Sequence, residues 1–217
     1  ARRYVQRDNV VDWQSPQTVL AKIGLTPEDV DTVLLTHAHY DHMGNLMAFP
    51  NAHFYIQERE YFKWMWAASL PKKFQNMNMA INPNDLQNAT TLMLNGRLTL
   101  VDGLTEDVLP GIDLVPAYDG HTFASQMVVI NNASGPGKGV WVNGGDIAYV
   151  RGNLTGVNND GMYVALGLAC GTPYNMLAAL DEMMEIAGGR LQRVIVGHES
   201  DNWELYPSWQ TADGLHV

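Results

Sequence analysis

The chain has 217 residues, 46% of them hydrophobic, and a formal net charge of −10 at pH 7. This length and apolar content are enough for one domain with a sizeable core, so we expect residues 1–217 to fold as a single domain. The acidic balance argues against nucleic acid or an anionic membrane as a partner, because both require a basic face on the protein. The single cysteine, Cys170, excludes an intrachain disulfide bond and a zinc site built from cysteines.

The first residues, Ala1 to Tyr4, include neither a start methionine nor the apolar run of a signal peptide. We therefore expect that the sequence starts part-way along a longer chain, and a cytoplasmic location is the working expectation. No apolar run approaches the roughly 18 residues that a membrane-spanning helix needs.

The N-terminal half alternates between helical and extended patterns. Ser15 can cap a first helix, and Gly24 ends it. Short apolar runs rich in β-branched residues predict strands, while longer runs with aromatic residues at helical spacing predict helices. The predicted elements are a helix at 16–23, strands at 31–36 and 52–57, and a helix at 58–68. Residues 71–85 show poor periodicity.

The C-terminal half is richer in strands. Its turn-rich loop at 132–138 predicts a hairpin, and Pro173 together with Gly188 and Gly189 marks the two ends of a helix. The predicted elements are strands at 98–101, 112–117, 125–131, 139–143 and 190–196, and a helix at 173–187. Strand-rich and helical parts together predict an α/β domain.

Residues 37–42 read His-Ala-His-Tyr-Asp-His and follow the predicted strand at 31–36 directly. Side chains two apart on an extended chain point the same way, so His37 and His39 can hold one metal ion together. Asp41 is also an even number of residues from His37 and His39, so its side chain points the same way, and His42 is free to face a second ion. Burying these four groups without a metal would leave several of them unpaired, at roughly 1–3 kcal/mol each. The motif therefore predicts a metal site.

The remaining ligands of a two-metal site are expected downstream, just after predicted strands. His121 follows the strand at 112–117, Asp146 follows the strand at 139–143, and His198 follows the strand at 190–196. Clefts in open α/β sheets lie beyond the carboxyl ends of strands, so these side chains can gather at one edge.

This pattern resembles the metallo-β-lactamase superfamily, over about residues 31 to 199. The resemblance implies a four-layer αβ/βα sandwich, and because only 36 residues precede the motif, we expect part of the N-terminal sheet to be missing. It implies two Zn²⁺ ions, with iron or manganese in some branches. By resemblance, the first ion is held by His37, His39 and His121, the second by Asp41, His42 and His198, and Asp146 bridges them.

The branch that looks closest is the N-acyl homoserine lactonase type, whose members are quorum-quenching enzymes. That type carries a tyrosine three residues after the bridging aspartate, which Tyr149 matches. Its glycine-histidine motif is matched by His121 and Gln126, whereas Phe123, Ala124 and Ser125 depart from it. The resemblance implies a dinuclear hydrolase that opens a lactone or related cyclic ester by metal-hydroxide attack.

Asp41 and Tyr149 are the predicted catalytic residues. Asp41 would protonate the leaving alkoxide, and Tyr149 would donate a hydrogen bond to the developing oxyanion. Two alternatives remain open: hydrolysis of another ester, such as a phosphate, sulfate or thioester, and a mononuclear iron oxygenase of the same fold. The expected partner is a small-molecule substrate, and a homodimer is the assembly to test.

Two acidic residues and two apolar stretches are expected near the site because of their positions in the sequence. Asp119 and Glu199 flank predicted ligands and could accept hydrogen bonds from imidazole N–H groups. The apolar stretches 61–66 and 77–81 could roof a substrate pocket; alternatively, Phe62, Met65 and Trp66 within the first stretch are core residues. Cys170 is expected to be a small buried hydrophobic residue.

Overall fold

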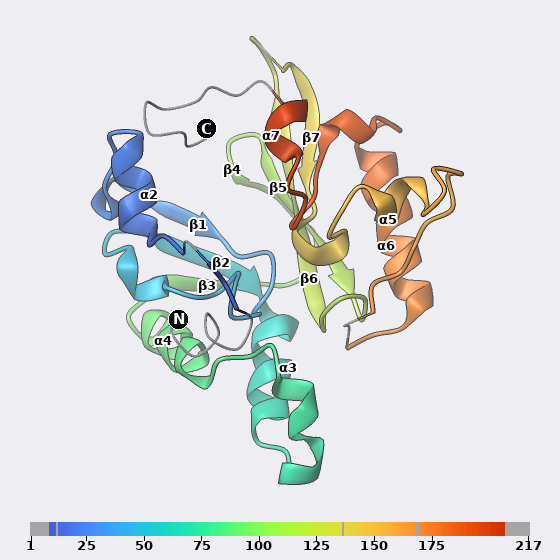
Figure 1. Cartoon of the computed structure of the whole chain (residues 1–217). Coiled ribbons are helices and arrows are strands. Elements are labelled where there is room, and N and C mark those ends of the chain that lie inside the picture. The colour runs from blue at the N-terminus through green and yellow to red at the C-terminus, as the bar shows by residue number, and fades with distance from the viewer. Residues whose placement is uncertain (1–8, 12, 136, 168–169, 207–217) are drawn as a thin grey trace.

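Two β-sheets lie face to face in the computed structural model, which describes residues 9–206 apart from 12, 136 and 168–169 (Figure 1). The first sheet is entirely parallel and has the order β1-β2-β3. Its strands are β1 (Thr32–Leu34), β2 (His53–Gln57) and β3 (Leu98–Val101). The second sheet has the order β4-β5-β6-β7-β8 and is antiparallel except for the β7–β8 pair. Its strands are β4 (Thr105–Leu109), β5 (Ile112–Tyr118), β6 (Ala124–Asn132), β7 (Gly139–Asn143) and β8 (Val194–Ile195).

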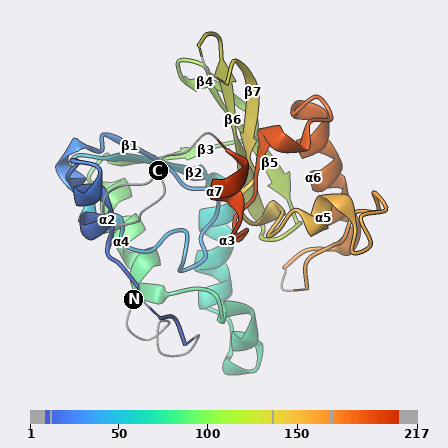
Figure 2. The same cartoon turned by 45° about the horizontal axis from the view of Figure 1, so that its top comes forward.

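Helices cover the outer faces of the two sheets, as the views in Figures 1 and 2 show. The helices beside the first sheet are α2 (Pro16–Lys22), α3 (Glu58–Ala68) and α4 (Pro83–Leu94). Those beside the second sheet are α5 (Gly152–Thr155) and α6 (Pro173–Ile186), with the short α7 (Asn202–Leu205) near its end. Short 3₁₀ turns complete the chain: η1 (Pro27–Asp29), η2 (Leu46–Ala48), η3 (Lys72–Asn78), η4 (Gly145–Ile147) and η5 (Leu191–Arg193).

Three apolar cores hold these layers together. The first joins the first sheet to α3 and α4, and includes Phe54 and Trp64. The second joins the second sheet to α6, and includes Val142 and Met183. A smaller core lies between the sheets, around Leu114. The order helix, sheet, sheet, helix confirms the predicted four-layer α/β sandwich.

The predicted helices are confirmed, and two of them, α2 and α6, begin with a side-chain cap, of which Ser15 was predicted. The Ser15 side chain accepts a hydrogen bond from the Thr18 N–H at 3.2 Å, and the Thr172 side chain accepts one from the Asn175 N–H at 3.1 Å. These caps satisfy backbone donors that a helix start otherwise leaves free.

The helices α4, α5 and α7 and the strand β4 were not predicted, and the strands β1 and β8 are shorter than predicted. Helix α4 was missed because its polar Asn and Thr residues obscure the apolar stripe, although Asn82 caps it and Pro83 opens it. Strand β4 was missed because it is an edge strand with exposed Glu106 and Asp107. Of the strand predicted at 190–196, only β8 pairs with a neighbour.

None of the described helices has the length and apolar character to cross a bilayer.

Candidate metal centre

The histidine-rich motif lies just past the end of β1, where the strand leaves the first sheet. His37 and His39 are both buried, 0% and 8% exposed, as their shared parity predicts. The chain then turns, since the N–H groups of His42 and Met43 both donate to the His39 carbonyl, at 3.0 and 2.8 Å. His42 is an odd number of residues from His37 and His39, so on an extended chain its side chain would point the other way. This turn brings its imidazole back to the site.

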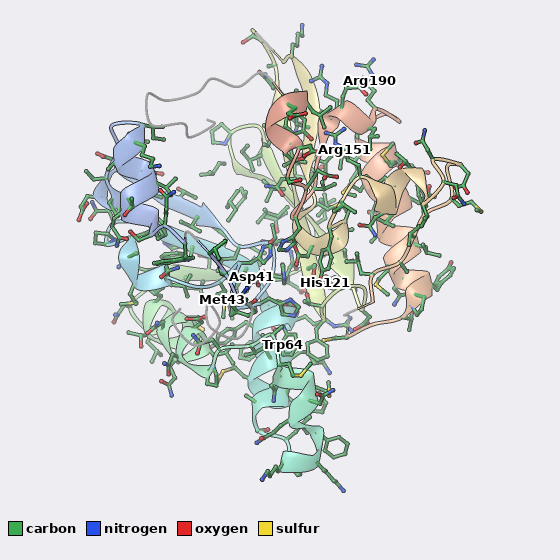
Figure 3. The ribbon with its side chains drawn as sticks, viewed as in Figure 1. Asp41, Met43, Trp64, His121, Arg151 and Arg190 are labelled. Atoms are coloured by element: carbon green, nitrogen blue, oxygen red, sulfur yellow. The ribbon has the colours of Figure 1, made fainter. Side chains whose placement is uncertain are left out.

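The downstream residues reach the same place from loops of the second sheet. His121 lies in the connection from β5 to β6, Asp146 lies in η4 after β7, and His198 lies after β8. Figure 3 shows Asp41 and His121, from the loops of opposite sheets, close to each other between the layers. The structure therefore brings together all seven residues named as ligands.

The seven residues form two groups that share one carboxylate. The buried group consists of His37, His39, His121 and Asp146, and the more exposed group consists of Asp41, His42, Asp146 and His198. Within each group, one nitrogen or oxygen atom per residue lies within 4.8 Å of all the others. Imidazole nitrogens and carboxylate oxygens at such separations can converge on a cation such as Zn²⁺.

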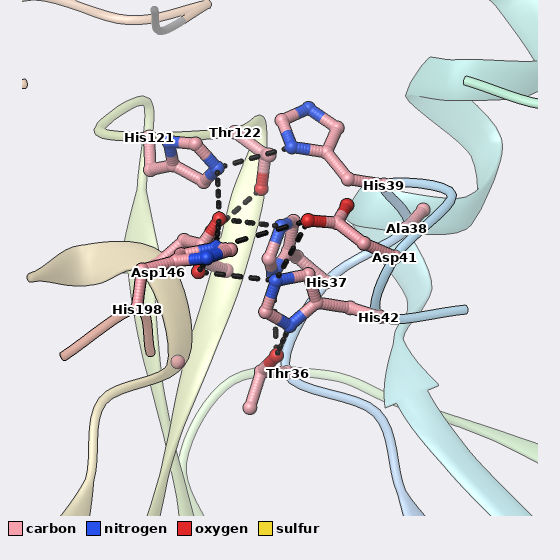
Figure 4. Close-up of polar contacts among 12 residues, drawn as sticks. Thr36, His37, Ala38, His39, Asp41, His42, His121, Thr122, Asp146 and His198 are labelled. Atoms are coloured by element: carbon pink, nitrogen blue, oxygen red, sulfur yellow. Dashed lines mark hydrogen bonds and ion pairs between the residues drawn. The ribbon is translucent and has the colours of Figure 1, made fainter. Parts of the chain in front are cut away.

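Asp146 occupies the centre of this arrangement (Figure 4). Its Oδ2 lies 3.4 Å from His121 Nε2 and 3.7 Å from His37 Nε2. Its Oδ1 lies 3.0 Å from His42 Nε2 and 3.1 Å from His198 Nε2. His198 Nε2 also lies 3.3 Å from Oδ2, so Asp146 contacts imidazoles of both groups, as a bridging ligand must.

The protonation states of His37, His39 and Asp146 also suit a cation. Burial, followed by the neighbouring imidazoles, lowers the pKa of His37 well below its usual range, and the same causes lower the pKa of His39 to about 3. Burial alone would raise the pKa of Asp146, but hydrogen bonds from His121, His198 and His42 hold it well below its usual range. Neutral imidazoles and ionised carboxylates are the forms that bind metals.

One buried atom supports metal binding directly. The Nε2 atom of His37 is enclosed and has no hydrogen-bond partner among the described residues. Its other ring nitrogen, Nδ1, lies 3.1 Å from the Thr36 hydroxyl. A buried polar atom without a partner is costly, so the free Nε2 fits a group that binds a metal ion at this position.

Two supporting residues were not predicted from the sequence. The Thr36 hydroxyl lies 3.1 Å from His37 Nδ1 and 3.4 Å from His42 Nδ1, so it orients one imidazole of each group with Nε2 toward the centre. Its position immediately before the motif is the signal that could have revealed it.

Glu60 is the second, and it links α3 to the loops of both sheets. This fully buried carboxylate accepts hydrogen bonds from the N–H groups of Ala38 at 3.0 Å and Ala124 at 2.7 Å. It also accepts from Trp64 Nε1 and from the Thr122 hydroxyl, both at 2.8 Å. All four partners donate and oppose the rise in the pKa of Glu60 that burial causes, so Glu60 acts as an acceptor that holds the His37–His39 and His121 loops together. No sequence signal separates it from other helical acids.

The close approach of the loops depends on two glycines. A Cβ at Gly145, where φ is +49°, would lie 2.8 Å from the Thr36 side chain, and a Cβ at Gly197 would lie 2.5 Å from Asp146 Oδ1. Side chains at these positions would push the loops apart.

Tyr149 lies beside the centre, as predicted. Its ring centroid is 5.5 Å from that of His121 and 5.0 Å from that of His198. Burial, followed by the charges of Asp146 and Asp41, raises the pKa of Tyr149. The phenol therefore keeps its proton and can act as a hydrogen-bond donor. Its backbone is held by the Asn153 side chain, which accepts from the Tyr149 N–H at 3.0 Å.

The expected imidazole partners Asp119 and Glu199 bind elsewhere. Asp119 forms an ion pair with Arg59, and Glu199 accepts a hydrogen bond from the Arg151 N–H at 3.0 Å. The prediction was wrong because adjacency in sequence does not set side-chain direction in a turn.

Cys170 is partly buried against the first core, and burial raises the pKa of its thiol to about 12.

A cavity of about 660 Å³ opens beside Asp41 and His198. The stretches 61–66 and 77–81 do not line it, whereas Phe62 and Trp66 line a separate cavity of about 380 Å³. Within α3, Tyr61 and Trp64 are core residues, whereas Phe62, Met65 and Trp66 are exposed. The alternative that these three are core residues is wrong, because they lie on the solvent side of the helix.

Comparison with known proteins agrees with this geometry. The sequence profile of the Metallo-beta-lactamase superfamily matches residues 7–198. The chain belongs to the metallo-beta-lactamase superfamily. This confirms the predicted resemblance.

A probable metallo-hydrolase of Methanocaldococcus jannaschii is 45% identical over 42 residues, which cover 19% of this chain and 21% of that protein. A probable metal-dependent hydrolase from Staphylococcus aureus superposes with a TM-score of 0.63 at 21% identity, covering 92% of this chain and 65% of that one. AidC, a dizinc quorum-quenching lactonase, superposes with a TM-score of 0.62 at 19% identity, covering 95% of this chain and 71% of that one. These structures share the fold, and this chain spans only part of their length.

Proposed function

We propose that this member of the metallo-beta-lactamase superfamily is a dinuclear metal hydrolase that opens a lactone or a related cyclic ester. The observation that carries the proposal is the sharing of Asp146 by two groups of ligands. A single ion would need only one group, whereas a carboxylate that belongs to both groups suits two ions side by side.

The proposed ligands are His37, His39 and His121 for one ion, Asp41, His42 and His198 for the other, and Asp146 between them. Two Zn²⁺ ions would supply an activated water as nucleophile and an electrophile for the ester carbonyl. Iron or manganese fits the same nitrogen and oxygen donors.

Two side chains are placed to complete the reaction. Tyr149 keeps its proton and can donate it in a hydrogen bond to the carbonyl oxygen as negative charge develops there. Asp41 lines the cavity, and its Oδ2 lies 3.7 Å from His198 Nε2. From this position Asp41 could accept the proton that the attacking water releases and pass it to the alkoxide that leaves when the ring opens.

The choice of a lactone rests on three supports. Tyr149 matches the lactonase pattern in sequence and lies beside the ligands in space. Structural neighbours at about a fifth sequence identity include AidC and other N-acyl homoserine lactone hydrolases. The cavity beside Asp41 is large enough for a small organic substrate, since ligand pockets typically span about 300–1,000 Å³.

The test is metal analysis and substrate profiling of the purified protein. We expect two metal ions per chain and hydrolysis of γ- and δ-lactones at a rate well above that of an aryl phosphodiester. His39→Ala should lower kcat/KM by more than about a hundredfold, because it removes a ligand of the buried group. His53→Ala is the matched control, since His53 bonds Thr99 on β3, away from the centre.

Each alternative has a distinct outcome. A protein that cleaves the phosphodiester but no lactone would contradict the proposed substrate and support another ester. One iron per chain with consumption of oxygen would support a mononuclear oxygenase. Full activity in His39→Ala would refute the metal mechanism itself.

A further inference from the structure

Helix α3 carries apolar side chains on two of its sides. One side packs into the first core through Tyr61 and Trp64, which are buried. The other side presents Phe62, Met65 and Trp66 to solvent, each between 40% and 51% exposed. A surface helix normally has polar residues opposite its buried stripe. Packing within the described part of the chain therefore does not account for this second apolar side.

The turn η3 extends the exposed apolar surface with Phe74 and Met77. The Asn78 side chain donates a hydrogen bond to the Ala67 carbonyl at 3.0 Å, which holds η3 against the end of α3. Figures 1 and 2 show that α3 and η3 project together beyond the first sheet. Residues 61–79 are called the α3–η3 tip below. Large apolar side chains gathered on one projection are typical of a surface that binds a partner.

The tip is basic, although the chain as a whole has a net charge of −10. Between Glu60 and Asp85 the sequence has no acidic residue and three lysines: Lys63, Lys72 and Lys73. All three lysines are exposed. The acidic balance of the whole chain argues against an anionic membrane only where the surface lacks a basic face, and the tip provides such a face locally.

Two ammonium groups of the tip lie close to exposed aromatic rings. Lys63 Nζ is 5.4 Å from the centroid of the Trp66 ring, and Lys73 Nζ is 5.3 Å from the centroid of the Phe74 ring. Aromatic rings flanked by lysines suit the boundary of a bilayer. The rings can enter the headgroup region while the ammonium groups stay at the level of the phosphates.

Two exposed acidic residues adjoin α3, but at its start. Glu58 and Asp102 line a cavity of about 380 Å³ there, and Lys63 lines it as well. Lys72 and Lys73 lie in η3, beyond the opposite end of the helix. The positive charge at the end of the tip is therefore not balanced by these two acids.

We propose that the α3–η3 tip docks on an anionic lipid surface. Its exposed rings and methionines enter the headgroup region, and its lysines bind the lipid phosphates. The acidic remainder of the chain is repelled by the same surface, so the molecule approaches with the tip first. A second copy of the chain suits the tip less well, because a symmetric contact would bring Lys72 and Lys73 of both copies together.

The test is cosedimentation of the full chain with vesicles of phosphatidylcholine, either alone or mixed in equal parts with phosphatidylglycerol. We expect binding to the mixed vesicles to be about tenfold tighter or more, because each lysine near an anionic surface adds attraction. Added salt should weaken this binding, since it screens the lysines. Equal binding to both kinds of vesicle overturns the proposal. Binding to neither also overturns it and leaves a protein partner as the occupant to seek.

Variants with matched controls locate the binding surface. Lys72→Glu should weaken binding to mixed vesicles about fivefold or more. Lys138→Glu makes the same change of charge in the exposed loop between β6 and β7 and should bind like the parent. Phe74→Ser should also weaken binding, whereas Leu94→Ser, at the exposed end of α4, should not. If Lys72→Glu and Phe74→Ser both bind like the parent, the proposal is overturned.

Fluorescence tests whether the tip itself enters the lipid. Phospholipids brominated on their acyl chains quench tryptophans that reach them, so mixed vesicles of such lipids should quench the parent protein. Trp66→Phe should remove most of this quenching, and Trp141→Phe, on β7 of the second sheet, should retain it. Quenching that persists in Trp66→Phe would place another surface on the membrane and refute the assignment.

Sedimentation velocity without lipid tests the other occupant. We expect the parent and Phe74→Ser to have the same oligomeric state, because the tip is free in the absence of lipid. A dimer that Phe74→Ser dissociates would show that a second copy covers the tip, which would overturn the proposal.

Discussion

The phenol of Tyr149 contacts imidazoles of both ligand groups and is expected to act through its hydroxyl. Tyr149→Phe keeps the ring contacts with His121 and His198 but removes the donor. We expect kcat to fall about tenfold to a hundredfold with little change in KM, because the lost hydrogen bond forms with the developing oxyanion. Steady-state kinetics on a lactone measures both constants.

Tyr163→Phe is the matched control, since Tyr163 donates its hydroxyl hydrogen to Asp181 on α6. It should leave kcat unchanged. If Tyr149→Phe also leaves kcat unchanged, Tyr149 is a packing residue and not a catalytic one.

At the level of single residues, the sequence predicted the shared orientation of side chains that are neighbours in the chain. The parity of His37 and His39 predicted that both point the same way, and both are buried in one group. Thr36 was not predicted although its partners His37 and His42 are close to it in the sequence, whereas the role of Glu60 depends on contacts between segments far apart in the chain. Gln126 was noted only as a matching residue, yet its amide donates to the Leu35 carbonyl at 2.7 Å and so ties β6 to the segment before the motif.

Among the elements, α3 depends on Glu60 for its connection to both ligand loops. Glu60→Gln replaces one acceptor oxygen with an amide that faces donors. We expect it to lower the free energy of unfolding by about 2–4 kcal/mol, since buried donors lose their partner. It should also lower the metal content after dialysis, because the two loops are no longer held in place.

Urea unfolding and metal analysis test the role of Glu60, with Glu58→Gln as the control on the exposed side of the same helix. The control should match the parent protein in both measurements. Loss of stability with full metal retention in Glu60→Gln would show that Glu60 supports the fold without positioning the ligands.

Elements with a clear apolar period were predictable, and those without one were not. The apolar pattern of α6 and its proline start predicted its bounds to within a residue. Strand β4 carries acidic residues on its exposed side and depends on pairing with β5 for its conformation. Local propensity therefore could not indicate it, since the pairing arises only when the sheet assembles.

Across the whole molecule, the ligands join the two sheets. The buried group takes His37 and His39 from the first sheet and His121 and Asp146 from the second, so their meeting depends on how the sheets pack. Sequence predicted the four-layer arrangement through the family resemblance. The packing angle and the cavity shape follow from contacts such as Gln57 to Gln126, at 2.9 Å between β2 and β6, which no local pattern indicates.

A metal ion between the sheets should stabilise the folded chain as a whole. Unfolding separates the two halves of each ligand group, so an ion that binds only the folded state adds about 2.7 kcal/mol when present at a hundred times its dissociation constant. For a chain of this size that corresponds to a rise in melting temperature of about 5–10 °C. We expect removal of metal with a chelator to lower the melting temperature by this amount and added Zn²⁺ to restore it. Differential scanning calorimetry on His53→Ala should show the same response, whereas Asp146→Asn should respond weakly, because Asp146 serves both groups. Equal melting temperatures with and without metal would mean that these imidazoles and carboxylates do not bind an ion in the folded protein.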